Sequence, residues 1–389
     1  MKITLLTGEF PPLEGGVGDF TRELARALAA LGHDVHVLTS GGKGAKDEAQ
    51  EPYATHRTVP SWGWGCWRAI RRWIARHRPD VVNIQYQAAA YAMRPAIHLL
   101  PWRLQWLPGR PAVVVTYHDL KVPYLFPKAG PFRWQAVLAL ARWSDAAIVT
   151  NQKDHLTLSR YPSLASPADI IPIGSNIAPQ PPAGYDRAAW RARYRLAADD
   201  LLLAYFGFLN ESKGGETLFR AFHKLAAANA RLLMIGGLFG ASDPTNRAYQ
   251  ARVADLIAQL GLEKHVYWTG YTPPEKVSAN LLAADVCVLP YRDGVSFRRG
   301  SFMAALAHSR PVVSTFPQIP LPELADGENV LLVPPDDPDA LAAAVARLAA
   351  DPGLRQRLGD GARKLSSLFT WDRIAARTAD LFERVRKDV

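Results

Sequence analysis

Two stretches of alternating strand-like and helix-like sequence, separated by a proline-rich segment, constrain the fold of this chain most. The first opens with an apolar run at residues 2–7, a glycine-rich turn and a helical pattern of apolar residues. After Pro179-Gln180-Pro181-Pro182, an apolar run at residues 201–206, a second glycine turn and a second helical pattern repeat this order. Strands that alternate with helices form parallel, doubly wound sheets. We therefore predict an α/β protein with two Rossmann-like domains that face a cleft, residues 1–178 and 179–370.

Length and composition agree with a folded protein of about two domains. The chain has 389 residues, of which 48% are apolar and 21% charged, and a single core rarely extends beyond about 300 residues. No window reaches the roughly 18 apolar residues of a spanning helix, and the first residues lack the apolar core of a secretion signal. Cys66 and Cys287 form no disulfide or metal pattern, so we expect a cytoplasmic, reduced protein.

Further elements follow from the same patterns. Residues 79–85, 112–117 and 146–150 have the apolar, branched composition of buried strands, whereas residues 41–60 look like a loop. His118 comes directly after the second of these strands, and open α/β sheets bind ligands at the carboxyl ends of their strands. A single histidine is often structural, but this position favours a functional one.

The junction between an apolar run and a helix near residue 300 combines hydroxyls, a glycine and two arginines. Such a junction offers free backbone N–H groups, the positive end of a helix dipole and guanidinium groups, which together suit a phosphate or diphosphate. Taken alone, the same residues also describe a solvated basic loop. The candidate residues are Ser296, Arg298, Arg299, Gly300 and Ser301.

A glycine turn follows the first strand of each half. Gly15 and Gly16 lie in the first turn, and Gly207 lies in the second, shortly before Lys213. Glycine lets the backbone approach a ligand at the start of a helix. The spacing is not that of the dinucleotide fingerprint, and a glycine turn by itself is weak evidence for a site.

The positive charge of the chain is concentrated in its first half. The net charge is +10, and between Glu51 and Asp119 the single acid is Asp80, against nine arginines and six of the eleven tryptophans. Arginine and tryptophan together suit an anionic, amphipathic surface.

Residues 67–78 form a basic helix within this segment. Ile70 and Ile74 are expected to pack on the sheet, which alone would explain the helix. The remaining residues predict contact with an anionic membrane surface, on the inner face of the membrane. They are Arg68, Arg71, Arg72 and Arg76 of the helix, with Trp62, Trp64, Trp102 and Trp106 nearby.

Several short motifs, in order and spacing, resemble the GT-B glycosyltransferases, and in detail the retaining, nucleotide-sugar-dependent family 4. The resemblance covers nearly the whole chain. Its residues are Pro11-Pro12 with Gly15-Gly16-Val17, Gly32-His33-Asp34-Val35, Pro79-Asp80-Val81-Val82, Thr116-Tyr117-His118-Asp119, Ile171-Pro172-Ile173-Gly174, Lys213-Gly214 and Pro311-Val312-Val313.

The chain departs from the family in its catalytic signature. Counting back from Pro311-Val312-Val313 puts Ser296 and Ala304 at the positions of the family's two glutamates. Phe208 stands where the family has an arginine before the lysine. Our hypothesis is that Arg298 and Arg299 replace that arginine.

The resemblance implies a sugar transfer from a nucleotide-sugar donor to a glycan or lipid-linked acceptor, with retention and without a metal or other cofactor. The N-terminal domain would hold the acceptor and the C-terminal domain the donor. Lys213, Arg298 and Arg299 are assigned to the diphosphate, and His118 would face the transferred sugar. The other assigned donor-binding residues are Gly15, Gly16, Gly207, Gly300, Ser301 and Ser296.

The missing glutamates keep a second class of function open. The chain could be a catalytically impaired GT-B protein that binds a nucleotide or an anionic glycolipid without turnover. Nucleic-acid binding is disfavoured because the basic surface carries no known recognition module. The last helix, residues 371–386, has apolar residues at helical spacing and, as in the family, is expected to pack back on the N-terminal domain.

Overall fold

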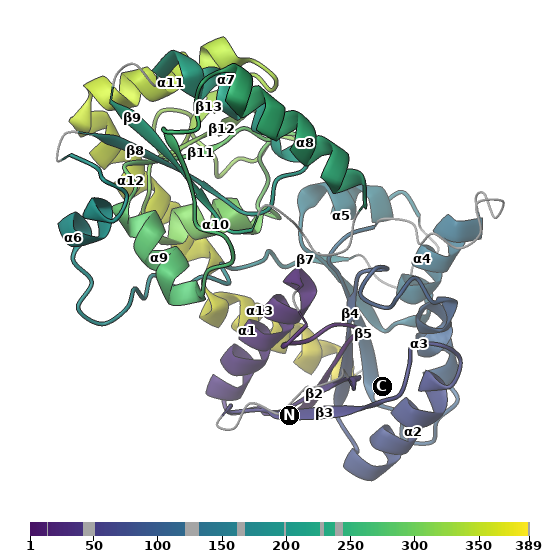
Figure 1. Ribbon diagram of the computed structural model, residues 1–389. Helices are drawn as coiled ribbons and strands as arrows, with labels where there is room; N and C mark the ends of the chain where they lie inside the picture. The colour runs from purple at the N-terminus through teal and green to yellow at the C-terminus, as the bar shows by residue number, and fades with distance from the viewer. Residues whose placement is uncertain are drawn as a thin grey trace. The chain divides into compact units, whose positions relative to one another are not determined.

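The computed structural model describes residues 1–13, 15–41, 51–120, 132–161, 168–197, 200–225, 229–237 and 244–387. The chain divides into two compact units (Figure 1). The N-terminal unit comprises Met1–Gly174 and Thr370–Val389, and the C-terminal unit is Ser175–Phe369. The break between the units therefore precedes the prolines at 179–182.

The N-terminal unit is built on a seven-stranded parallel sheet. The order of its strands is β3-β2-β1-β4-β5-β6-β7, so the direction of winding reverses between β1 and β4. The strands are β1 (Lys2–Thr7), β2 (Asp34–Ser40), β3 (Ala54–Val59), β4 (Val81–Tyr86), β5 (Ala112–Tyr117), β6 (Ala146–Val149) and β7 (Asp169–Ile170).

Strand β3 corrects the prediction of a loop at residues 41–60. It pairs in parallel with β2 at the edge of the sheet. Its sequence, ATHRTV, is polar, and only Val59 is fully buried. An edge strand with little buried surface has no apolar run to reveal it, although the β-branched threonines suit a strand. Residues 42–50 of the predicted loop lie outside the described residues.

Helices cover both faces of this sheet, as Figure 1 shows. One core contains side chains of α1 and α13, and the other contains side chains of α2, α3 and α4. Ile70 and Ile74 of α2 are buried on the sheet, as predicted. The helices are α1 (Gly16–Ala30), α2 (Cys66–His77), η1 (Pro95–Leu99), α3 (Leu100–Leu104), α4 (Phe132–Trp143), α5 (Gln152–Leu158) and α13 (Trp371–Lys387).

The last helix, α13, belongs to the core of the N-terminal unit. Ile374, Leu381 and Phe382 are buried in one cluster with Leu24 and Leu28 of α1. The apolar stripe read from the sequence therefore faces α1 and the sheet. Thr378 is also buried and donates its hydroxyl to the carbonyl of Ile374 at 2.7 Å, which satisfies the polar group within the helix.

The C-terminal unit is a second parallel sheet, with the order β10-β9-β8-β11-β12-β13. This is the Rossmann order, in which the winding reverses between the first and fourth strands in sequence, here β8 and β11. The strands are β8 (Leu201–Phe206), β9 (Ala230–Ile235), β10 (Val266–Trp268), β11 (Val286–Leu289), β12 (Val312–Thr315) and β13 (Leu331–Val333).

The helices of the C-terminal unit follow the predicted alternation, and two of them, α6 and α9, add to the elements read from the sequence. Asp186 caps α6 by accepting a hydrogen bond from the N–H of Ala189. The helices are α6 (Arg187–Ala192), η3 (Glu211–Lys213), α7 (Gly215–Leu225), α8 (Pro244–Gln259), α9 (Pro274–Ala283), α10 (Gly300–Ala307), α11 (Pro338–Ala350), α12 (Pro352–Ser366) and η5 (Ser367–Phe369). The chain thus has an α/β fold with two Rossmann-like domains.

Candidate active site

The winding reversal of the C-terminal unit brings two loops together. One loop joins β8 to α7, and the other joins β11 to α10. Ligands of doubly wound sheets bind at such reversals, outside the carboxyl ends of the strands. Each loop carries candidate residues predicted from the sequence, Gly207 and Lys213 in the first and residues 296–301 in the second.

Gly214 holds the first loop against the second. Its φ of 69° lies in the left-handed region, and a Cβ atom at this position would lie 1.9 Å from the carbonyl oxygen of Pro290. Only glycine permits both the conformation and the close approach. The preceding residue, Lys213, is thereby fixed beside the end of β11.

Tyr291 is the centre of the arrangement. Its side chain is fully buried, and its hydroxyl lies 2.6 Å from the hydroxyl of Ser301. The Nζ atom of Lys213 lies 5.6 Å from the centre of the Tyr291 ring, and the Cζ atom of Arg299 lies 4.8 Å from it. Cations over an aromatic face are attracted by the ring quadrupole. The two positive side chains therefore converge on one ring.

Gly207 lies next to this pair. A Cβ atom added there would be 3.8 Å from Nζ of Lys213 and 3.9 Å from Cβ of Ser301. The absence of a side chain leaves the backbone beside Lys213 and Ser301 uncovered, at a φ of 114°. Gly207 and Lys213 are thus brought together with Arg299 and Ser301, which lie more than 80 residues later in the sequence.

The N-terminus of α10 completes the group. Gly300 and Ser301 open the helix, and Arg299 at the N-cap position provides no side-chain cap. The first N–H groups of a helix have no partner within it, and they carry a partial positive charge that attracts anions. Beside Lys213 and Arg299, this end of α10 suits a phosphate or diphosphate.

The surroundings also set the charge of Lys213. The pKa of Lys213 is lowered to about 8, mainly by burial and also by the charge of Arg299, whereas the charge of Asp293 raises it. Asp293 forms an ion pair with Arg299. An anion placed between Lys213 and Arg299 would relieve the repulsion between them.

The remaining candidates of this loop lie beside the group. Ser296 is partly buried, and its carbonyl accepts a hydrogen bond from the N–H of Arg299 at 3.0 Å. Arg298 is also partly buried and has interaction partners of its own. Of the two arginines, Arg299 is the one that stacks on Tyr291. Ala304 is fully buried in α10.

The N-terminal unit has its own winding reversal, between β1 and β4. The turn after β1 contains Gly15 and Gly16, and α1 starts at Gly16. The carboxylate of Glu9 accepts hydrogen bonds from the N–H groups of Val17 at 3.0 Å and Gly18 at 3.4 Å. A Cβ atom on Gly15 would lie 2.2 Å from this carboxylate. A negative group therefore already occupies the start of α1, and Gly15 makes room for it.

Burial raises the pKa of Glu9, although the bonds from Val17 and Gly18 oppose this shift. Glu9 was not among the residues predicted from the sequence to have a role. The available signal is an acidic residue seven positions before the start of α1, with Gly15 between them, because a carboxylate is favoured at the N-terminus of a helix.

His118 is anchored by a chain of amides. Its Nε2 atom lies 2.8 Å from Oε1 of Gln85, so it donates to that oxygen. Gln85 in turn donates to Asn83, and Asn83 donates to the hydroxyl of Thr116 at 2.9 Å. This chain fixes the ring and leaves Nδ1 as the acceptor. Gln85 and Asn83 were missed because polar residues in a buried strand carry no local signal of their partners.

The ring of His118 also packs edge-on against Phe20 of α1, with the ring centres 4.7 Å apart. Burial lowers the pKa of His118 to about 3. The imidazole is therefore neutral near pH 7 and suited to accept a hydrogen bond from a hydroxyl rather than to act as a cation.

The residues that the structure describes contain no group of three or more His, Cys, Asp or Glu side chains that could hold a metal ion. Asp119 accepts a hydrogen bond from Gln87 at 3.1 Å, and Asp293 pairs with Arg299. Within the same described part of the chain, no helix is both long and apolar enough to span a bilayer.

Comparison with known families accounts for both halves of the chain. Residues 14–178 match the model described as Glycosyltransferase Family 4, and residues 200–351 match the model described as Glycosyl transferases group 1. The chain belongs to glycosyltransferase family 4. Its similarity to an inositol 3-phosphate glycosyltransferase of Streptomyces bingchenggensis agrees, at 30% identity over 98% of this chain and 89% of the relative.

Other relatives extend the comparison. A GDP-mannose-dependent phosphatidylinositol monomannoside mannosyltransferase of Mycobacterium tuberculosis is 27% identical over 97% of both chains. Sucrose-phosphate synthase from Thermosynechococcus elongatus is a solved structure with a TM-score of 0.78 and 25% identity, over 100% of this chain and 99% of that one. HepE of Anabaena, solved with UDP, has a TM-score of 0.77 and 18% identity over 99% of this chain and 100% of that one. This glycosyltransferase therefore has the GT-B fold.

Proposed function

We propose that this glycosyltransferase moves a sugar from a nucleoside-diphosphate donor to a lipid-linked or glycan acceptor, with retention of the anomeric configuration. The observation that carries the proposal is the convergence of Lys213 and Arg299 on Tyr291 beside the uncapped start of α10. Positive groups aimed at the developing charge of a leaving diphosphate are the main need of such a transfer.

The low basicity of His118 supports a retaining mechanism in which no side chain acts as the base. With its pKa lowered to about 3, the ring is a weak base near neutral pH. A donor phosphate that accepts the proton of the acceptor hydroxyl, as the family resemblance implies, requires no side-chain base. His118 would then accept a hydrogen bond from the sugar through Nδ1, with Gln85 holding the ring in place.

The direct test is a screen of donor hydrolysis across UDP- and GDP-sugars, followed by transfer to candidate acceptors. The anomeric configuration of the product is then read from the proton NMR coupling of its anomeric hydrogen. One or more donors should be cleaved, and the product should keep the configuration of the donor. Inverted product would exclude the retaining mechanism, and binding without cleavage of any donor would exclude the transfer.

The pKa of Lys213 predicts a dependence on pH. Its folded-state pKa of about 8 lies below the ordinary lysine value, so the free enzyme loses this cation as the pH rises through about 8. We expect kcat/KM for the donor to fall above that pH, because kcat/KM reports ionisations of the free enzyme. Lys213→Arg keeps the charge and should flatten the profile. An identical decline in both proteins would assign the ionisation to another group.

Activity is expected to persist in EDTA. Lys213 and Arg299 supply the positive charge that a metal would otherwise bring to the diphosphate. The measurement is the initial rate of donor turnover before and after dialysis against chelator. Complete loss that magnesium or manganese restores would show that the reaction requires a metal.

The exposed positive charge of the N-terminal unit supports a lipid-linked acceptor at the inner face of an anionic membrane. Arg68, Arg71, Arg72 and Arg76 of α2 are exposed, and a basic side chain near an anionic surface contributes about 1 kcal/mol. The relative from M. tuberculosis is named for a phosphatidylinositol monomannoside acceptor.

The tryptophans divide into two groups. Trp64 and Trp106 are 55% and 69% exposed and can enter a membrane interface, whereas Trp102 is partly buried. Trp62 was predicted to lie at the surface, and that prediction is wrong. Its exposed fraction is 6%, because its ring packs edge-on against the ring of Tyr91, with the ring centres 4.7 Å apart.

Co-sedimentation with vesicles tests the membrane proposal. We expect binding to vesicles rich in phosphatidylserine at low salt, weaker binding at high salt, and little binding to neutral phosphatidylcholine vesicles. Trp64→Ser with Trp106→Ser should reduce the binding, whereas the buried Trp62 offers no contact to lose. Equal and negligible binding to both kinds of vesicle would favour a soluble acceptor.

A second candidate function is nucleotide or glycolipid binding without turnover. Ser296 and the buried Ala304 stand at the positions of the family's two glutamates, and neither can act as a carboxylate. If this candidate is right, calorimetry will show saturable UDP or GDP binding that depends on Lys213, while the donor screen shows no cleavage. Turnover above the rate of a Lys213→Ala control would exclude it.

A further inference from the structure

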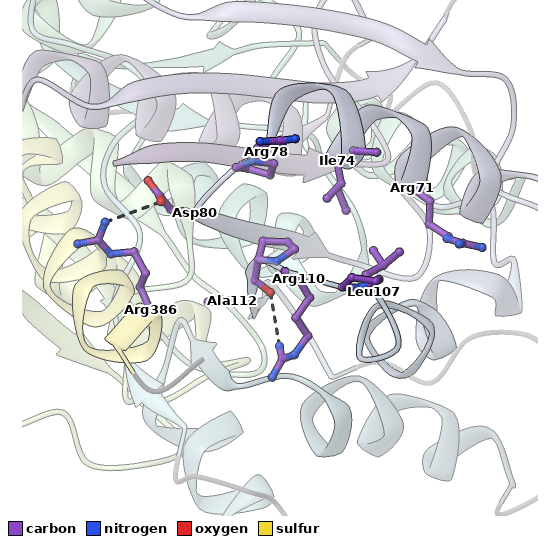
Figure 2. A pocket seen from close by; sticks show the side chains of 13 residues that line it. Arg71, Ile74, Arg78, Asp80, Leu107, Arg110, Ala112 and Arg386 are labelled. Atoms are coloured by element: carbon purple, nitrogen blue, oxygen red, sulfur yellow. Dashed lines mark hydrogen bonds and ion pairs between the residues drawn. The ribbon is translucent and has the colours of Figure 1, made fainter.

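A pocket of about 650 Å³ opens at the amino ends of β4 and β5, in the N-terminal unit (Figure 2). Its wall is formed by the end of α2, the segment that enters β4, the loop before β5 and Arg386 of α13. The volume is within the range of small-molecule sites, about 300–1,000 Å³.

This pocket lies far from the candidate active site of the same unit. Pro79 and Pro111 line it directly before β4 and β5, whereas His118 follows the far end of β5. Each strand has six residues, which at about 3.3 Å per residue corresponds to about 20 Å. The pocket is therefore a separate feature of the sheet.

Four arginines and one acid carry the charge of the lining. Arg71, Arg78, Arg110 and Arg386 face a single lining carboxylate, Asp80. Arg71 lies in α2 and Arg78 at its C-cap, whereas Arg110 lies in the loop before β5 and Arg386 on α13 (Figure 2). Arginine side chains frequently bind phosphate groups, because the guanidinium can donate two parallel hydrogen bonds to the phosphate oxygens.

Two of these arginines are already neutralised. Arg110 makes two bonds to the carboxylate of Asp145, at 2.6 and 2.8 Å. Arg386 lies 3.7 Å from Asp80, whose other oxygen accepts the N–H of Lys2 at 2.7 Å. These pairs hold the wall of the pocket in place and contribute little free positive charge.

The positive charges of Arg71 and Arg78 are not compensated by an ion pair within the described residues. Throughout the described part of the chain, neither guanidinium has a hydrogen-bond or ion-pair partner, and both side chains are exposed. Arg78 also has a φ of 47°, in the left-handed region, at the C-cap of α2. Glycine is the usual residue at such a helix end, because side chains are strained there. In that conformation the N–H of Arg78 donates to the carbonyl of Ile74 at 2.8 Å, which holds the backbone of Arg78 at the mouth of the pocket.

We propose that this pocket binds a small anion that carries one or two phosphate groups, with Arg71 and Arg78 as the residues that bind it. Asp80, paired with Arg386, would orient the ligand by excluding a phosphate from its own side of the pocket. The same chemistry is offered by a soluble phosphorylated metabolite and by the phosphorylated headgroup of a lipid.

The test measures pyrophosphate binding by isothermal titration calorimetry to the full chain. Lys213→Ala with Arg299→Ala serves as the background, because it weakens the proposed donor site. We expect saturable binding to this background protein. Adding Arg71→Gln and Arg78→Gly should weaken binding at least tenfold. The matched control is Arg94→Gln, which removes an exposed arginine of the N-terminal unit that does not line the pocket, and it should leave the affinity unchanged.

Arg78→Gly separates ligand binding from a structural role. Glycine accepts the left-handed conformation, so the variant should unfold at the same temperature as the parent or a higher one while binding less pyrophosphate. A lower unfolding temperature together with unchanged binding would show that Arg78 serves the fold.

Vesicles of phosphatidylcholine with and without phosphatidylinositol phosphate distinguish the two sources of the anion. Binding to phosphorylated vesicles that Arg78→Gly alone abolishes, together with pyrophosphate binding, supports a lipid headgroup as the ligand, because Arg78 is not one of the arginines assigned to the membrane surface. Pyrophosphate binding without vesicle binding supports a soluble ligand. The proposal is overturned if neither probe binds, or if the quadruple variant binds both as well as its background does.

Discussion

Lys213→Ala is expected to lower kcat/KM for the nucleotide-sugar donor by ten- to a hundredfold or more. Lys213 is held beside Tyr291 and Ser301 by the contact of Gly214 with Pro290, where it can reach a diphosphate. A charge-assisted hydrogen bond contributes about 1.5–3 kcal/mol, and each 1.4 kcal/mol corresponds to about a factor of ten. The measurement is the initial rate of donor turnover against donor concentration.

The control for this change is Lys264→Ala. Lys264 is exposed and lies just before β10, which is an edge strand of the same sheet, whereas Lys213 lies beside the central strands β8 and β11. Lys264→Ala should leave turnover at the wild-type level, and the Lys264→Ala and Lys213→Ala proteins should unfold at similar temperatures. Wild-type kinetics in Lys213→Ala would remove the lysine from the donor site.

The two arginines offer a finer comparison in the same assay. Arg299→Ala should approach the effect of Lys213→Ala, because Arg299 stacks on Tyr291 beside the start of α10. The sequence assigns Arg298 to the diphosphate as well, and Arg298→Ala is also expected to weaken donor use, but less. Equal rates for Arg299→Ala and the wild type would contradict the assignment.

The largest expected effect on stability comes from Phe382→Ala in α13. The Phe382 ring is fully buried in the cluster that joins α13, α1 and the sheet. Removing a buried phenylalanine side chain typically costs about 3–5 kcal/mol, since a cavity remains. The N-terminal unit should therefore unfold at a clearly lower temperature in differential scanning calorimetry.

Phe316→Ala is the matched control, because Phe316 is 48% exposed in the C-terminal unit and its loss leaves little cavity. If Phe382→Ala and Phe316→Ala shift the unfolding temperature equally, α13 is not part of the N-terminal core under the conditions of the experiment. A shift confined to Phe382→Ala would support the packing of α13 on α1.

The sequence by itself determined the class of the fold and most of its elements. Apolar periodicity is a local property, and it predicted β1, β5 and β8, as well as the apolar faces of α2 and α13. The family could also be recognised from the sequence, since the glycine turns and the motifs after the strands appear in a fixed order. These signals depend on residues that are near one another in the chain.

Tertiary structure alone decided which distant side chains meet. The convergence of Lys213 and Arg299 on Tyr291 depends on the winding reversal that places β8 beside β11. In the same way, strand β3 exists because β2 offers it an edge, and Trp62 is buried because Tyr91 lies against it. Such contacts join residues that are remote in sequence, so no local pattern encodes them.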